Sequence, residues 1–323
     1  MERLLSGNAP LCGMAGLELI VRPLDYRSAA RFWGIDDPAL AMKVNAILGG
    51  TPAYRWEFVG GDTPDGPDDF DSWVVRTVLN RAGPLLRESR YLLEDELGVN
   101  STRTHHAILS AIADGNTARG GVGHYRTVLE DAGLVVPEHD AFRDNRTTFR
   151  IAEPLLTFYH AVMRPIWTDL EHSRDATELW RRNQHRFTGQ VLGPHFERTC
   201  RYWTRHMAGP DLFGDYPNRV CAGTVNDPAA KTNHEVDVVV FGLTDDNQRP
   251  ILAIGEVKWG ETMGMGHLNR LRHIRGLLAA QGKLGAETAK LACYGGAGFT
   301  AELTAESKRN DDVVLVGLAD LYS

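Results

Sequence analysis

Two apolar runs in the last third of the chain decide its fold: Glu235–Phe241 (EVDVVVF) and Ile251–Lys258 (ILAIGEVK). Each run is short, rich in valine and isoleucine, and bounded by residues that break regular structure. The segment Thr244–Pro250 (TDDNQRP), which lies between them, is made of turn-forming residues. The sequence therefore predicts two strands joined as an antiparallel hairpin.

The predicted hairpin brings acidic side chains together. Side chains alternate between the two faces of a strand, so Glu235 and Asp237 share one face, and Glu256 and Lys258 share one face. A hairpin centred between residues 246 and 247 sets Asp237 opposite Glu256, and Glu235 opposite Lys258. Because directly opposed carboxylates repel each other, we expect a cation between Asp237 and Glu256.

This arrangement suits metal-dependent hydrolysis of phosphodiesters. Carboxylate oxygens are hard ligands that bind Mg²⁺ while the ion keeps several waters, so Asp237 and Glu256 are candidate ligands, with the carbonyl of Val257 as a third. A bound Mg²⁺ or Mn²⁺ polarises a phosphoryl oxygen and activates a water. Lys258 is the candidate group that positions this water and stabilises charge on the phosphate.

The same residues have an explanation that needs no metal. Asp237, Glu256 and Lys258 could form one buried ion pair together with a charge at its rim. The local pattern leaves both explanations open.

The order of Asp237 and then Glu256-x-Lys258 resembles the PD-(D/E)XK nuclease superfamily. In that superfamily a glutamate on a helix approaches the metal from beside the sheet. The resemblance implies this role for Glu197, which lies in a helix that we expect over about Phe187–Met207.

A wider resemblance covers nearly the whole chain. It is to a family of prokaryotic AAA+ type ATPases that carry a nuclease-like C-terminal domain. The stretches that carry it are Thr224–Lys258, Gly264–Leu278 and Leu291–Leu303 toward the C-terminus, and Leu48–Tyr54, Val128–Val135 and Phe149–Met163 upstream.

This resemblance implies a fold class of α/β plus all-α parts and four consecutive regions. Residues 1–100 would be a remnant of the ATPase core edge and its helical lid, and residues 101–150 a shortened, degenerate winged helix. A linker helix would cover residues 151–177, and a PD-(D/E)XK-like mixed-sheet domain residues 178–323. An AAA+ type ATPase subunit is an implied partner.

Nucleotide hydrolysis is not expected of this chain. The AAA+ relatives carry a P-loop, G-x-x-x-x-G-K-[ST], whose amides and lysine hold phosphates, and the sequence contains none. We therefore expect no ATP cofactor, and a chain that is a truncated or split relative or has a late start codon.

Composition narrows the class of protein. The 323 residues carry a net charge of −7, so any contact with nucleic acid must be local. The cysteines Cys12, Cys200, Cys221 and Cys293 show no paired spacing, which argues against zinc sites and disulfide frameworks. No apolar run is long enough to span a membrane, and the N-terminus lacks a signal peptide pattern. We expect a cytoplasmic protein that contacts no membrane.

Two groups of arginines are candidates for binding a phosphate backbone. The expected wing, Glu138–Arg150, carries Arg143 and Arg146, and the expected helix His267–Ala280 carries Arg270, Arg272 and Arg275. An ordinary solvated helix face is the favoured explanation for the second group. The histidines show no metal-ligand spacing.

The sequence thus predicts a nucleic-acid-associated protein with a Mg²⁺-dependent nuclease-like site at Glu197, Asp237, Glu256 and Lys258. DNA is the expected partner, but the sequence does not decide between DNA and RNA. The competing hypothesis is a non-enzymatic DNA-binding or regulatory fragment of an AAA+ type ATPase. The intact acids favour the first, whereas the missing P-loop and the shortened winged helix favour the second.

Overall fold

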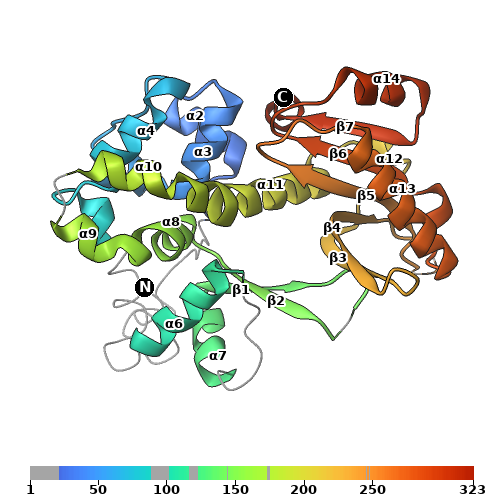
Figure 1. The fold of residues 1–323 in the computed structure, drawn as a ribbon, viewed down its shortest axis with the longest axis horizontal. Coiled ribbons are helices and arrows are strands. Elements are labelled where there is room, and N and C mark those ends of the chain that lie inside the picture. The colour runs from blue at the N-terminus through green and yellow to red at the C-terminus, as the bar shows by residue number, and fades with distance from the viewer. Residues whose placement is uncertain are drawn as a thin grey trace, which may run out of the picture.

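The computed structural model describes residues 22–88, 102–115, 123–143, 145–172, 175–244, 246 and 248–323. Within these ranges the chain is a mixed α/β structure, as expected, in which helices precede and flank one five-stranded sheet (Figure 1). The first part of the expected ATPase remnant, residues 1–21, lies outside the described residues.

The first helices begin at aspartates that cap them. α2 (Tyr26–Trp33) follows Asp25, whose carboxylate accepts hydrogen bonds from two backbone N–H groups, and it ends at Gly34 with φ of 69°. This left-handed conformation is the usual helix end that glycine allows. α3 (Pro38–Leu48) follows Asp37, which accepts from the N–H of Leu40 at 2.7 Å. Aspartate at the N-cap and proline at the first helical position are the expected start signals.

Short helical segments complete this first part of the chain. They are a π-helical turn at Tyr54–Phe58, a 3₁₀ turn at Pro67–Asp69, α4 (Phe70–Trp73) and a second π-helical turn at Val74–Val78. The last of these turns ends at Val78.

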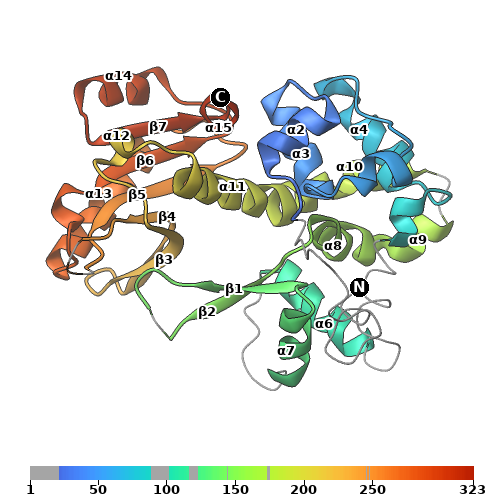
Figure 2. The ribbon, with the colours of Figure 1, turned by 180° about the vertical axis from the view of Figure 1, so that it is seen from behind.

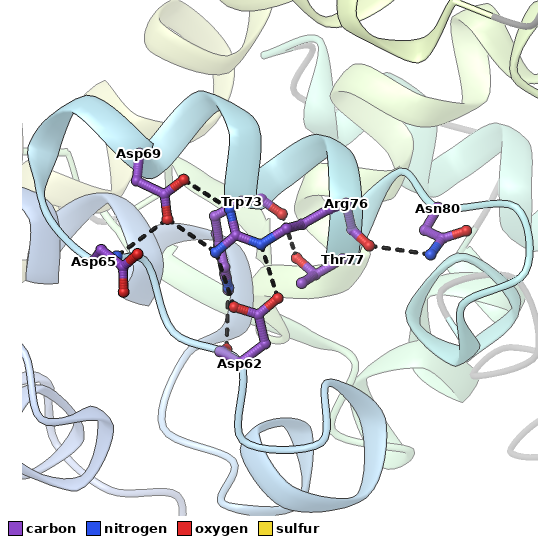
Figure 3. Close-up of polar contacts among 7 residues, drawn as sticks. All are labelled: Asp62, Asp65, Asp69, Trp73, Arg76, Thr77 and Asn80. Atoms are coloured by element: carbon purple, nitrogen blue, oxygen red, sulfur yellow. Dashed lines mark hydrogen bonds and ion pairs between the residues drawn. The ribbon is translucent and has the colours of Figure 1, made fainter.

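Arg76 fastens the loop before α4 to the helical turn that follows it (Figure 3). Its guanidinium donates to both carboxylate oxygens of Asp62 at 2.8 and 2.9 Å, and to both of Asp69 at 2.7 and 2.9 Å. The Nε1 group of Trp73 donates to the carbonyl of Asp62 at 3.1 Å. The nearby guanidinium lowers the pKa of Asp69. One arginine thus closes the loop through two bidentate pairs.

The middle of the chain has two helices followed by a hairpin. These are α6 (Thr102–Ala113), α7 (Gly123–Asp131), and the antiparallel strands β1 (Val135–His139) and β2 (Thr147–Ile151). The residues that follow β1 dock on the main sheet, because the N–H of Ala141 donates to the carbonyl of Ala222 at 2.8 Å. A side chain at Gly223 would lie 2.8 Å from the Cβ of Ala141, so this close contact requires glycine.

A series of helices then leads to the sheet. α8 (Pro154–Phe158) continues through a π-helical turn at Tyr159–Met163 and a 3₁₀ turn at Arg164–Ile166 into α9 (Trp167–His172). α10 (Ala176–Arg186) continues through a π-helical turn at Phe187–Leu192 into α11 (Gly193–His206). The helix expected over Phe187–Met207 is thus confirmed. Figures 1 and 2 show α11 running from the helical part to the sheet.

The sheet has the strand order β3-β4-β5-β6-β7. Its first three strands are antiparallel and its last two are parallel to β5. The short helix α12 (Pro210–Phe213) precedes the sheet, and α15 (Leu318–Tyr322) ends the chain. Between β5 and β6 lie α13 (Met265–Ala280) and a 3₁₀ turn at Ala286–Thr288. Between β6 and β7 lies α14 (Ala301–Arg309). The strands are β3 (Arg219–Asp227), β4 (Thr232–Phe241), β5 (Ile251–Lys258), β6 (Lys290–Gly295) and β7 (Val313–Gly317).

Both faces of the sheet are buried. On the α11 face, Val238, Val240 and Ala253 belong to one core that continues into the N-terminal helices. On the opposite face, Val239 and Ile254 pack in a second core with residues of α13. Burial on both faces explains why the central strands are nearly continuous apolar runs rather than strictly alternating ones.

Candidate metal centre

Asp237 lies where β4 separates from β5. The ladder pairs Val238 with Gly255 and Val240 with Ala253, which is the predicted register, and Asp237 is one residue beyond its last pair. The predicted pairs of Asp237 with Glu256 and of Glu235 with Lys258 do not form, and Glu235 lies opposite Thr224 of β3. These two pairs are wrong because the ladder between β4 and β5 begins only at Val238.

A β-bulge in the β3–β4 ladder lies at the same point of β4. Cys221 lies opposite Val239, but Gly223 lies opposite Val236, so β4 has one more residue than β3 between the two pairs. Bulges of this kind bend a strand and redirect a side chain. The side chain of Asp237 turns toward β5, where its Oδ2 accepts a hydrogen bond from the N–H of Val257 at 2.8 Å.

The carbonyl of Val257 lies on the same side as its N–H. In an extended strand, the N–H and C=O groups of one residue point toward the same neighbouring strand. The carbonyls of Val257 and Lys258 therefore point in opposite directions, and that of Lys258 accepts from the N–H of Gly296 at 2.8 Å, beyond β6. The Val257 carbonyl consequently faces the gap in which the carboxylate of Asp237 lies.

Glu256 is buried, with 4% of its surface exposed, and its carboxylate is paired with two cations. Oε1 lies 3.2 Å from the Nζ of Lys258, and Oε2 lies 3.0 Å from Nη1 of Arg270 on α13. Arg270 also donates to the carbonyl of Glu235 at 2.6 Å. A carboxylate removed from water needs such partners, and here the chain itself supplies them.

Glu197 reaches the same region from α11. Burial, and to a smaller extent the negative charge of Asp237, raise its pKa to about 7 against the opposing effects of Arg201, Arg198 and Lys258. Burial also raises the pKa of Asp237, against the opposing effects of the Val257 N–H and Lys258. Glu197, Asp237, Glu256 and Lys258 thus form one electrostatically coupled group, to which α11, β4 and β5 contribute.

A cavity of about 430 Å³ opens beside this group. It lies between the β1–β2 hairpin, α11 and the strands β3 and β4. Acidic and basic side chains both line it: the acids are Glu138, Asp140, Glu197, Glu235 and Asp237, and the arginines are Arg146, Arg201 and Arg219. Arg201 donates to the carbonyl of Asp237 at 2.9 Å, which places a guanidinium directly beside the candidate centre.

The two predicted groups of arginines have different surroundings. Arg143 donates to the side chain of Asn233 at 2.6 Å, and Arg146 to Thr224 at 3.1 Å, so both guanidinium groups contact neutral oxygens; of the two, Arg146 lines the cavity. On α13, by contrast, Arg270 pairs with Glu256, Arg272 pairs with Glu306, and Arg275 pairs with Asp312 at 3.1 Å.

A cluster that the sequence analysis missed lies elsewhere on the sheet. In the ranges that the structure describes, the ligand atoms of Asp227, His234 and His273 form the one group of three or more His, Cys, Asp or Glu side chains that all lie within 4.8 Å of one another. The histidines show no metal-ligand spacing along the sequence, but the fold brings two of them close to Asp227. The three residues meet only because β3, β4 and α13 are adjacent in space.

Comparison with known proteins gives little further information. No protein family model matches the chain, and no curated protein matches it. The crystal structure of protein VC1899 from Vibrio cholerae matches with 14% identity and a TM-score of 0.25, covering 74% of this chain and 54% of that chain. The chain thus spans about half the length of that protein, and a match with this TM-score carries no argument about fold or function. No helix among the described residues is long and apolar enough to cross a membrane.

Proposed function

We propose that the C-terminal part of the chain is a PD-(D/E)XK-like domain that hydrolyses phosphodiester bonds in nucleic acid with the help of Mg²⁺ or Mn²⁺. One observation carries the proposal: Asp237 lies at the point where two strands separate, next to Glu256 and Lys258 on the adjoining strand and Glu197 on the preceding helix. The order of α11, β3–β5, α13 and β6 agrees with the sequence resemblance to that superfamily.

The donor set fits a hard divalent cation. Asp237 and Glu256 offer carboxylate oxygens, and the Val257 carbonyl faces Asp237, so all the candidate ligands are the oxygen donors that Mg²⁺ prefers. When bound, the ion would supply positive charge for a phosphoryl oxygen and for an attacking water. To bind the ion, Glu256 would give up its contact with either Arg270 or Lys258.

The remaining residues of the group have roles that follow from their chemistry. Lys258 is a hydrogen-bond donor 3.2 Å from Glu256, placed to stabilise negative charge on a phosphate. Glu197, with its pKa raised to about 7 by burial, can hold or release a proton near neutral pH, as a general base requires.

Nucleic acid would approach through the cavity beside α11. Arg146, Arg201 and Arg219 line this cavity together with Glu197 and Asp237, so cationic groups for phosphates lie next to the acids. The arginines of α13 are weaker candidates, because Arg272 and Arg275 already pair with acidic side chains. DNA is the substrate that the family resemblance favours.

The N-terminal regions enter this proposal as accessory parts. The succession of α6, α7 and the β1–β2 hairpin supports a shortened winged-helix module, and the helices α2–α4 support a helical lid remnant. In this interpretation the chain works beside an AAA+ type ATPase subunit and has no ATP site of its own.

The test is a cleavage assay with the purified full chain. Single-stranded DNA, duplex DNA and RNA are incubated with Mg²⁺, with Mn²⁺ and with a chelator. We expect metal-dependent cleavage of DNA that Asp237→Asn abolishes and that Asp311→Asn, an exposed control outside the site, leaves intact. Equal cleavage by both variants would contradict the proposal.

A second candidate function rests on the two cations at Glu256. Because Lys258 and Arg270 compensate this carboxylate, the group can be stable without a metal, as in a non-enzymatic DNA-binding or regulatory fragment. Binding of DNA without metal affinity and without cleavage would favour this second function.

A further inference from the structure

We propose that Asp227, His234 and His273 form a binding site for Zn²⁺ or a similar divalent transition metal, separate from the carboxylate group at Asp237. The site connects the β3–β4 hairpin to α13. It is independent of the proposed hydrolytic function, because it shares no residue with that site.

The hairpin sets two of the ligands on one face of the sheet. Val225 lies opposite His234, and Asp227 lies opposite Thr232. Because residues two apart on a strand share a face, Asp227 and His234 both lie on the face of Val225. This residue belongs to the core that packs against α13, so His273 of α13 meets them from above that face.

The distances among the ligand atoms match a metal coordination sphere. Oδ2 of Asp227 lies 2.9 Å from Nε2 of His273 and 3.4 Å from Nε2 of His234. With metal–ligand bonds of about 2.0–2.2 Å, neighbouring ligand atoms around a zinc ion lie roughly 2.8–3.6 Å apart. The imidazole rings stand nearly perpendicular, at 83°, with centroids 5.3 Å apart, so both Nε2 atoms point toward the same carboxylate oxygen without stacking.

The carboxylate is fixed before any ion binds. Asp227 is 3% exposed, and its Oδ1 accepts from the N–H of Ala230 at 3.0 Å. This bond occupies one oxygen and directs Oδ2 toward the two histidines. Such supporting hydrogen bonds orient ligands in known metal sites.

The donor set selects the class of metal. Two imidazole nitrogens and one carboxylate oxygen suit Zn²⁺ and its neighbours, whereas Mg²⁺ prefers oxygen ligands alone. His273 has 53% of its side chain exposed, so water can fill the remaining coordination positions. Along α13, His273 is three residues from Arg270, which pairs with Glu256. An ion at this cluster would therefore fix the position of α13, whose Arg270 pairs with Glu256.

Chelator-treated full chain is titrated with Zn²⁺, and with Mg²⁺ as a comparison, by calorimetry and thermal unfolding. We expect one Zn²⁺ to bind with a rise in the unfolding midpoint. Loss of a residue that only supports a metal ligand typically lowers metal affinity by about 10–100-fold. His273→Ala and His234→Ala each remove a ligand itself, so the affinity for Zn²⁺ should fall by more than this. The exposed control His185→Ala should bind as the wild type does.

Because the His273 side chain is largely exposed, we expect His273→Ala to fold as the wild type does. Circular dichroism of the variant tests this. Cobalt substitution gives a second readout, because the visible spectrum of Co²⁺ reports nitrogen ligands and should change in both histidine variants. Zn²⁺ affinity and cobalt spectra unaltered by both substitutions, or no Zn²⁺ binding to the wild type, would overturn the inference. In either case Asp227 and the histidines would form only a hydrogen-bonded cluster.

Discussion

The carboxylate of Asp237 accepts a hydrogen bond of 2.8 Å from the backbone N–H of Val257. In a regular ladder this N–H would face a carbonyl of β4, but β4 pairs with β5 only from Val238 onward. The side chain of Asp237 replaces the missing backbone acceptor. This contact fixes a carboxylate beside the Glu256-Val257-Lys258 segment and prepares an acidic site at the edge of the ladder.

Replacing Asp237 with asparagine should remove metal binding and keep the fold. Asparagine still offers an oxygen to the Val257 N–H, but it has no charge for Mg²⁺ or Mn²⁺. We expect affinity to fall by at least about 10–100-fold, measured by calorimetry at neutral pH. The metal-free variant should unfold at the same or a higher temperature, because a carboxylate whose pKa burial raises is costly to bury in its charged form. Undiminished metal affinity would exclude Asp237 as a ligand.

Replacing Lys258 with alanine should separate metal binding from cleavage. Lys258 cannot ligate a cation, so the affinity for Mn²⁺ should be retained, whereas loss of one electrostatic contact to the transition state typically lowers the rate by about 10²–10³-fold. Single-turnover nicking of plasmid DNA measures this. Lys308→Ala on α14 is the matched control, since Lys308 is exposed and distant in sequence. If cleavage survives equally in Lys258→Ala and Glu256→Ala, a contaminating nuclease is responsible.

Arg146→Ala should weaken binding of DNA uniformly across sequences. The guanidinium lines the cavity beside Glu197 and Asp237, where it can neutralise a phosphate. Removing one phosphate contact should lower the slope of log affinity against log salt by about one. Fluorescence anisotropy at several salt concentrations measures the slope, with the exposed Arg309→Ala on α14 as the control. A slope equal to that of the wild type would remove Arg146 from the interface.

Arg76→Lys should destabilise the N-terminal helices. A lysine cannot form the two bidentate pairs with Asp62 and Asp69, because its ammonium lacks the planar fork of donors. The side chain of Arg76 is 39% exposed, so we expect a modest loss of about 0.5–1 kcal/mol in the free energy of unfolding. Urea denaturation compared with Arg309→Lys tests this, and identical midpoints would show that the pairs contribute nothing net.

His160 should make the protein less stable in mild acid. Its side chain is buried, its Nδ1 lies 2.9 Å from Oγ of Ser110, and burial lowers its pKa to about 3. The unfolded chain protonates this histidine below about pH 6.5. The neutral side chain therefore contributes stability that is fully present above pH 6.5 and is lost as the pH falls toward 3. Between pH 6.5 and pH 5 the loss approaches about 2 kcal/mol.

His160→Gln removes this titration, so the variant should lose less stability than the wild type between pH 7.5 and pH 5. Denaturant unfolding at the two pH values measures the difference, with His185→Gln as the exposed control. Parallel losses in wild type and His160→Gln would show that other groups govern the acid response.

Local signals in the sequence were sufficient for most elements. Asp25 and Asp37 cap α2 and α3, and such signals can be read from the sequence because an N-cap acts on its own helix. The register of Val238 with Gly255 also follows from the sequence, since turn length and apolar pattern fix a hairpin locally.

The sequence by itself determined the two central strands, the helix over Phe187–Met207, and the presence of Asp237, Glu256 and Lys258 on adjoining strands. Only the tertiary structure decided how β4 bulges to aim Asp237 at Val257, which cations compensate Glu256, and that Asp227 and His234 meet His273. The physical reason is the sequence separation of the interacting residues. Helix capping and hairpin register depend on residues that are close together in the chain. The partners of a buried charge or a ligand cluster come from elements that packing alone brings together.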